Sequence, residues 1–144
     1  MIARLNCQFV QRNMVYAEAN DTPEKAIRHL GELMAEDMRL ALLAQEDAVA
    51  ETKDKAPGMP AYLLTLEWPD GTASLNLFCG PDGWFDIWTF EMRRLAWLPV
   101  LPKRVSTEPR RASLEAFRQD IARVCAATAQ DAAAYLQKRS PAPP

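Results

Sequence analysis

Carboxylate residues near the ends of predicted strands are the feature of this sequence that comes nearest to acid–base chemistry. Asp82 and Asp86 stand around the start of one predicted strand, and Glu67 and Glu91 stand at the ends of two others. Such chemistry needs two carboxyl groups about 5 to 9 Å apart in unequal environments. Linear order does not bring these four together, and exposed carboxylates at strand ends are the ordinary case. A carboxylate-dependent enzyme, or a small-molecule binder with Asp82, Asp86 or Glu91 in a cleft between sheet and helix, is therefore kept as an alternative.

Thiol and imidazole groups are too few and too scattered to predict a nucleophile or a metal site. The one histidine, His29, lies beside Arg28 in a charged segment, and Cys7, Cys79 and Cys125 are far apart. The absence of a Cys-x-x-Cys pair argues against structural zinc, and three cysteines predict no disulfide framework. The serines lack the glycine-flanked turn of a serine nucleophile, and no phosphate-binding loop can be written. The sequence predicts no catalytic residue, no metal and no cofactor.

Aromatic and basic residues gather in and just after one predicted strand and form a candidate partner-binding group. Its members are Trp84, Asp86, Trp88, Arg93, Arg94 and Trp97. Trp and Arg are over-represented at binding hot spots. If Phe85 and Ile87 face the core, the tryptophans of this strand face outward and indicate a partner surface. The other interpretation, which we favour, is a strand buried on both faces.

Charge is unevenly distributed along the chain. Residues 21–54 hold nine acids and four bases, whereas residues 93–118 hold seven bases and two acids. The net charge of −2 argues against a general binder of polyanions, so nucleic acid is not an expected partner. Glu32, Glu36 and Asp37 of the first predicted helix could cover a basic site on a protein partner. Equally, the two charged segments could lie side by side and offset each other.

The first half of the chain predicts a strand, a possible return strand and a long helix. Alternating apolar residues mark a half-buried strand over 5–9, and residues 14–16 indicate a short strand that returns beside it. Pro23 suits the first turn of a helix that extends to about Ala50. The predicted inward stripe of this helix is Ile27, Leu30, Met34, Met38 and Ala41. Residues 55–60 predict a linker that stops it.

The middle of the chain predicts an antiparallel meander. Alternation indicates strands over 62–68, 73–79 and 84–90. Pro69-Asp70-Gly71 and Gly80–Gly83 carry the residues that tight turns require. Two tight turns between three short strands are typical of a meander.

The last third predicts irregular chain and then a helix. Two prolines restrict residues 95–102 to an irregular arm or an edge strand, and residues 106–111 are a polar lead-in. Ser113 can cap a last helix that runs to about Leu136, with an alanine-rich end.

Together these elements predict an α+β domain. We expect an antiparallel β-meander of three to five strands covered by two amphipathic helices, in the order β-α-β-β-β-α. Residues 1–139 should form one domain, and residues 140–144 a flexible proline-rich tail. Hydrophobic residues make up 49% and charged residues 25% of the chain, as in globular proteins. The N-terminus lacks the apolar core of a signal peptide, and no apolar run approaches the ~18 residues of a membrane span, so a cytoplasmic location is expected.

These features favour a non-enzymatic module that binds one protein partner. In broad traits the chain is similar to small bacterial accessory proteins such as toxin-neutralising immunity proteins and chaperones of secreted effectors, although no motif carries the likeness. A small-molecule binder or a minor carboxylate-dependent enzyme is one alternative. The other is a self-associating structural protein, a homodimer formed through the alanine-rich last helix or a free sheet edge.

Overall fold

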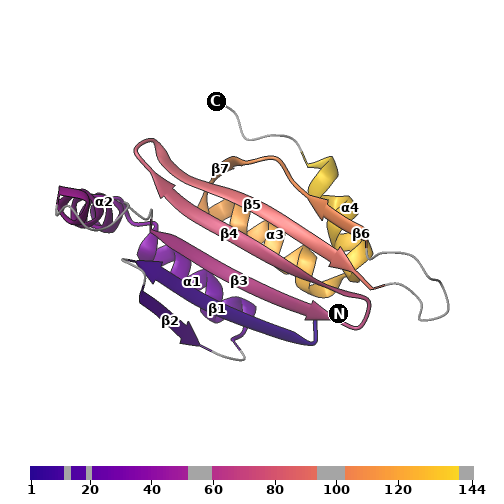
Figure 1. Cartoon of the computed structure of the whole chain (residues 1–144). Helices are drawn as coiled ribbons and strands as arrows, with labels where there is room; N and C mark the ends of the chain where they lie inside the picture. Colours follow the sequence, from indigo (N-terminus) through magenta and orange to yellow (C-terminus); the bar gives the residue numbers. More distant parts are fainter. Residues whose placement is uncertain (12–13, 19–20, 52–59, 94–102, 140–144) are drawn as a thin grey trace.

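The chain folds into an antiparallel sheet with helices packed against one of its faces (Figure 1). The computed structural model describes residues 1–11, 14–18, 21–51, 60–93 and 103–139. The described strands are β1 (Arg4–Gln11), β2 (Met14–Glu18), β3 (Ala61–Trp68), β4 (Gly71–Gly80), β5 (Gly83–Met92), β6 (Lys103–Ser106) and β7 (Arg110–Ala112). The described helices are α1 (Pro23–Leu33), α2 (Glu36–Glu51), α3 (Leu114–Ala126) and α4 (Ala129–Lys138). The predicted α+β class with an antiparallel sheet is confirmed.

The number and order of the elements differ from the prediction. The described residues hold four helices and seven strands in the order ββααβββββαα, instead of two helices in the order β-α-β-β-β-α. The return strand predicted at 14–16 is confirmed as β2. The polar lead-in predicted at 106–111 is wrong in part, because its two ends belong to β6 and β7. The predicted arm at 95–102, the tail at 140–144 and all of the linker except Pro60 lie outside the described residues.

The predicted meander forms the centre of the sheet. The strand order is β2-β1-β3-β4-β5-β6, and β6 and β7 share the edge of β5 that faces away from β4. Both predicted turns are tight, with Trp68 opposite Gly71 and Gly80 opposite Gly83. Gly83 has a φ of 130°, which side chains resist. A Cβ at Gly71 would lie 2.7 Å from the carbonyl oxygen of Glu91, so glycine lets the strands approach there.

The first predicted helix is broken at Met34 and Ala35. Leu30 of α1 is fully buried against the core, whereas α2 stands off the end of the sheet (Figure 1). The amide of Met34 still donates to the carbonyl of Leu30 at 2.8 Å, and the helix then stops. Glu36 and Asp37 occupy the first turn of α2, where the helix dipole favours negative charge. The chain therefore restarts as a second helix that leaves the inner face of the sheet.

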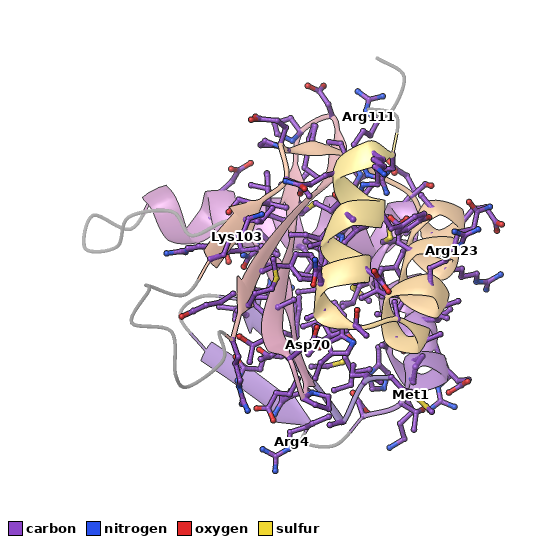
Figure 2. All side chains as sticks on the ribbon, turned by 90° about the vertical axis from the view of Figure 1, so that its right-hand side faces the viewer. Met1, Arg4, Asp70, Lys103, Arg111 and Arg123 are labelled. Carbon is purple, nitrogen blue, oxygen red and sulfur yellow. The ribbon has the colours of Figure 1, made fainter. Side chains whose placement is uncertain are left out.

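The last predicted helix is also two helices. Thr128 caps α4, because its side chain accepts a hydrogen bond from the amide of Asp131 at 3.1 Å. The carboxylate of Asp70 caps it a second time, accepting from the amides of Ala129 at 3.0 Å and Gln130 at 3.2 Å. Asp70 lies at the foot of α4 in Figure 2, so the β3–β4 turn holds the start of this helix.

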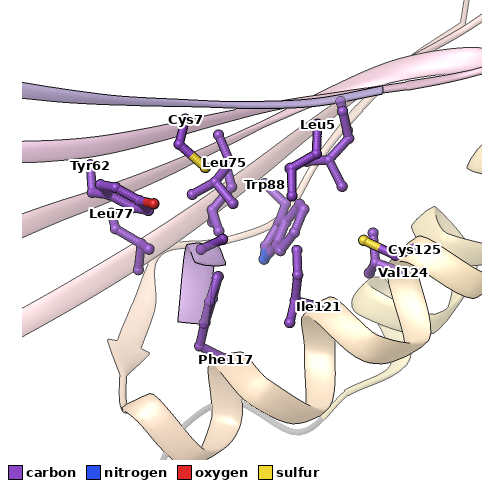
Figure 3. Packing of buried hydrophobic residues seen from close by; sticks show 14 of the residues in the cluster. Leu5, Cys7, Tyr62, Leu75, Leu77, Trp88, Phe117, Ile121, Val124 and Cys125 are labelled. Carbon is purple, nitrogen blue, oxygen red and sulfur yellow. The ribbon is translucent and has the colours of Figure 1, made fainter. Parts of the chain in front are cut away.

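The core lies between the inner face of the sheet and α1, α3 and α4. Phe90 packs between Trp68 and Trp88, with ring centroids 5.9 and 6.1 Å away. In Figure 3 the indole of Trp88 points from the sheet toward Ile121 of α3. Trp84 and Trp88 are 3% and 1% exposed, so the prediction that they bind a partner is wrong. Their side chains are part of the core that holds α3 and α4 on the sheet.

The other face of β5 has no described helix over it (Figure 1). Phe85 and Ile87 are half-buried there, and Phe85 stacks on Phe78 of β4 at 5.7 Å. The interpretation that turned Phe85 and Ile87 to the core and the tryptophans outward therefore assigned the two faces of β5 the wrong way round. The interpretation of a strand buried on both faces also overstates the burial of its outer side.

The cap from Asp70 makes stability depend on pH. Burial opposes ionisation of this carboxyl, but the amides of Ala129 and Gln130 outweigh it and hold the pKa of Asp70 below its ordinary value. A lowered folded-state pKa adds stability that is fully present above the unfolded-state pKa. This stability is lost as the pH falls through the folded-state pKa.

We predict that Asp70→Ala lowers the free energy of unfolding at neutral pH by about 1 kcal/mol, since two amides of α4 lose their acceptor. The difference from the parent should shrink in acid, where the parent carboxyl is protonated. Urea titrations across this pH range measure both effects. Asp82→Ala, at the exposed β4–β5 turn, is the control. A difference that does not change with pH would contradict the prediction.

Candidate functional site

Two buried aspartates and two partly buried arginines form a closed set of ion pairs, which we call the Asp–Arg ring. Its members are Asp86 on β5, Arg110 on β7, Asp120 on α3 and Arg139 after α4. Asp86 accepts from Arg110 Nε at 3.3 Å and from Arg139 Nη2 at 2.7 Å. Both arginines also donate to Oδ2 of Asp120. The four side chains are between 6% and 13% exposed, so the ring joins four elements in a largely dry environment.

Local structure explains how the ring assembles. Asp86 shares the inward face of β5 with Trp88, and the register of β5 and β7 sets Arg110 directly opposite it. Asp120 lies on the inward face of α3 beside Ile121. Sequence reasoning named Asp86 but missed the other three residues. The sequence did contain one signal for the ring, because Asp120 is a charged residue at an inward position of an amphipathic helix.

The ring leaves its carboxylates little freedom for chemistry. Tyr135 donates to Oδ1 of Asp120 at 3.1 Å, so each carboxylate oxygen in the ring has at least one donor. Burial raises the pKa of Asp86 above its ordinary value, although Arg139 and Arg110 oppose the shift. The two positive and two negative charges also balance. This arrangement suits a clamp between elements better than a proton relay.

The carboxylates that were kept as an alternative acid–base site lie in different places. Asp82 is exposed at the β4–β5 turn and Glu91 is exposed near the end of β5. Glu67 and Glu91 lie on either side of Thr72 in the same row of the sheet. The structure brings Asp86 to Asp120 instead, a pairing that sequence order does not reveal.

A cavity of about 370 Å³ lies beside the ring, between the segment that joins β6 to β7 and helix α4. Its lining residues are Ser106, Thr107, Glu108, Pro109, Arg110, Leu136, Gln137 and Arg139. Arg110 and Arg139 contribute both to the ring and to this lining. Asp82, Asp86 and Glu91, which were predicted for a cleft between sheet and helix, do not line it.

The described thiols are not poised for reaction or metal binding. Cys7, Cys79 and Cys125 are all buried, and no disulfide joins them. Burial raises the pKa of Cys125 to about 11, and it also raises the pKa of Cys79. Thiols with raised pKa values stay protonated at neutral pH and are poor nucleophiles. Within the described ranges, no three His, Cys, Asp or Glu side chains lie close enough to hold a metal ion.

The predicted partner-binding residues end up in different places. Asp86 is wrong as a surface contact, since it is buried in the ring with the two tryptophans nearby. Arg93 is exposed just after β5, whereas Arg94 and Trp97 lie outside the described residues. The acids Glu32, Glu36 and Asp37 are exposed around the junction of α1 and α2. Of the described members of the predicted set, Arg93 and these three acids are exposed, and the acids lie within six residues of one another along the chain.

Helix α2 has a partly reversed polarity, because charged residues lie beside leucines on its inward face and several apolar residues lie on its outward face. Arg39 and Glu46 are buried together with Leu42, whereas Met38 and Leu40 are 44% and 51% exposed. The alanines at positions 41, 44 and 48 are exposed as well. We call the exposed stripe of Leu40, Ala41, Ala44 and Ala48, with Met38 at its side, the α2 outer face. The predicted inward stripe is therefore wrong at Met38 and Ala41.

Hydrogen bonds to the β4–β5 turn explain this orientation. Arg39 Nη1 donates to the carbonyls of Gly80 at 3.0 Å and Pro81 at 2.9 Å. The same guanidinium binds Glu36, whose pKa is lowered by that hydrogen bond. An inward arginine can satisfy the carbonyls at the end of the sheet, which an apolar side chain cannot do. Met38, Leu40 and the alanines at positions 41, 44 and 48 are consequently turned to solvent, whereas Leu42 and Leu43 face the core.

The alanine-rich last helix offers less surface than predicted. Ala129, Ala132 and Ala133 of α4 are buried in the core of their own chain. These three alanines are therefore not available for a second copy of the chain. Ala134 remains exposed.

Comparisons with protein-family models, with curated proteins and with solved structures give no match, so function has to be inferred from this chain's own residues. No helix in the part of the chain that the structure describes is both long and apolar enough to cross a membrane.

We predict that Asp120→Asn lowers the free energy of unfolding by about 3 kcal/mol, because two partly buried guanidiniums lose a charged partner. Adding Arg139→Gln should cost less than the sum of the two single changes, since the two residues share one network. Denaturant titrations of the four proteins give this coupling. Asp82→Asn, which removes an exposed charge, should change stability by at most about 0.5 kcal/mol. Additive losses would contradict a closed ring.

Proposed function

We propose that this protein is a non-enzymatic module that binds one protein partner through the α2 outer face. The observation that carries the proposal is the reversed polarity of α2. A helix that turns Arg39 and Glu46 inward and Leu40 outward leaves apolar area in water. Exposed apolar area bordered by polar residues is typical of surfaces that bind other proteins.

The charges around this surface support a basic partner. Glu32, Asp37 and Asp47 are exposed along α1 and α2. Opposite charge on a partner would speed encounter and set the orientation of docking. A toxin that is neutralised, or a secreted effector that is kept soluble, is the class of partner that we propose.

The test of this proposal compares partner capture by matched variants. Leu40→Glu with Ala44→Glu adds two charges to the α2 outer face, and both sites are exposed. Ala122→Glu with Ala134→Glu adds the same charges to exposed sites on α3 and α4. We predict that the parent and the second variant retain one protein from a native-host extract, and that the first variant loses it. The melting temperature of each variant confirms that it is folded.

Reconstitution decides between a specific partner and adventitious capture. The purified candidate should form a complex of one-to-one stoichiometry with the parent, and Leu40→Glu/Ala44→Glu should weaken it roughly tenfold or more. Retention that does not depend on α2, or the recovery of no specific partner, would refute the proposal.

The cavity beside α4 supports a second candidate, binding of a small molecule. Its volume of about 370 Å³ falls within the range of roughly 300–1,000 Å³ for ligand pockets. Its lining combines the apolar Leu136 with polar side chains such as Thr107 and Gln137. We predict that Gln137→Trp, which places a large ring at the lining, abolishes any thermal shift caused by small polar metabolites. A metabolite screen without any shift in the parent would remove this candidate.

A further inference from the structure

We infer that the segment received by the α2 outer face is a basic amphipathic helix of the partner protein. This inference rests on the function proposed above and names the chemistry of its docking segment. It combines three observations: the spacing of the exposed apolar residues, their small size, and the acids that border them.

The exposed apolar residues of α2 are spaced for packing against another helix. Leu40, Ala44 and Ala48 are four residues apart and form one ridge, with Ala41 beside it. Ridges of this spacing interlock with the grooves of a second helix. With 16 residues, α2 is long enough to hold about four turns of such a helix. An extended segment has no grooves of this spacing to receive the ridge of α2.

The small side chains of the ridge favour a close contact. Alanine at 44 and 48 allows a second helix to approach to the short end of the usual range of about 8–10 Å between axes. Leu40 stands higher at one end of this ridge and is about half exposed, and Met38 lies on the far side of Ala41 from it. The occupant therefore needs large apolar side chains over the alanines and a smaller one opposite Leu40.

The acids around the α2 outer face favour positive charge on the segment that docks there. From His29 to Ala48 the chain holds five acids and one base. That base, Arg39, is buried and bonded to Glu36, so the exposed charge of this region is negative. Glu46 is buried on the inward side of α2, so Lys or Arg on the flanks of the occupant would meet exposed acids such as Asp37 and Asp47.

A second copy of the chain fits this surface poorly. Glu36 and Asp37 lie at the start of α2 and Asp47 lies toward its end. Two α2 helices would face acid with acid whether they ran parallel or antiparallel. Like charges brought together at an interface disfavour association. A basic helix is the occupant without this conflict.

Two synthetic helical peptides test the inference on the full-length protein. Both carry the same stripe of Leu and Ala at positions four apart, and their flanks consist of Lys in one and of Glu in the other. Fluorescence anisotropy measures binding, and chemical-shift changes in the ¹⁵N-labelled protein map the contact. We expect the Lys peptide to bind at least tenfold more tightly than the Glu peptide, and to weaken as salt is raised. The shifts should centre on α2.

Variants separate the apolar contribution from the electrostatic one. Leu40→Glu/Ala44→Glu should abolish the α2 shifts, whereas Ala122→Glu/Ala134→Glu should leave them unchanged. Glu32→Gln/Asp47→Asn should reduce the preference for the Lys peptide, and Glu91→Gln/Glu108→Gln, which removes two exposed acids away from α2, should preserve it.

The possible results distinguish this inference from the proposed function. Equal binding of both peptides, binding centred on another element, or no binding of either would overturn the inference. If a captured partner still depends on Leu40 and Ala44 in any of these cases, the proposed function stands and its docking segment has another chemistry. If neither the peptides nor a captured partner depend on α2, both proposals fail.

Discussion

Keeping water away from the inner face of the sheet is the constraint on which the rest of the structure depends. That face carries Trp68, Trp88 and Phe90 in one layer of aromatic rings, together with the leucines of β3 and β4. Helices from both halves of the chain cover it. Where α1 meets α3, Gly31 lies so close to Leu114 that an added Cβ would be 3.3 Å from its side chain. After the first break the chain leaves this face as α2, whereas after the second break α4 packs on the sheet as well, with its start held by Asp70.

The Asp–Arg ring follows from the same constraint. The inward positions of β5 and α3 include Asp86 and Asp120, and isolated charges in such positions would be costly. Arg110 and Arg139 neutralise both carboxylates and bind β7 and the end of α4 to the sheet. Buried ion pairs add less net stability than apolar packing, but their geometry can select one arrangement over others. In this protein the ring is suited to fixing where α4 ends.

Helix α2 contributes less to the core than the other described helices, through Leu42 and the partly buried Leu43. Its inward face is held by the hydrogen bonds of Arg39 to the β4–β5 turn and by burial of Leu42. Its outward face is therefore open to another molecule without any loss to the core. Other helices cover the sheet, so the outward face of α2 can bind another molecule. This arrangement connects the fold to the proposed binding role.

The sequence by itself determined the central strands, their turns and the α+β class, because alternation and turn chemistry act between near neighbours. It also placed Glu32, Glu36 and Asp37 on an accessible surface. Tertiary structure alone decided which face of β5 is covered, because an alternating strand such as Trp84 to Phe90 offers two apolar faces. It also decided where the helices break, since the end of α1 and the start of α4 depend on the sheet beneath them. The Asp–Arg ring and the reversed polarity of α2 arise from hydrogen bonds between residues that are far apart in the sequence. Arg139 and Asp86, for example, are 53 residues apart. Local sequence patterns do not contain such contacts.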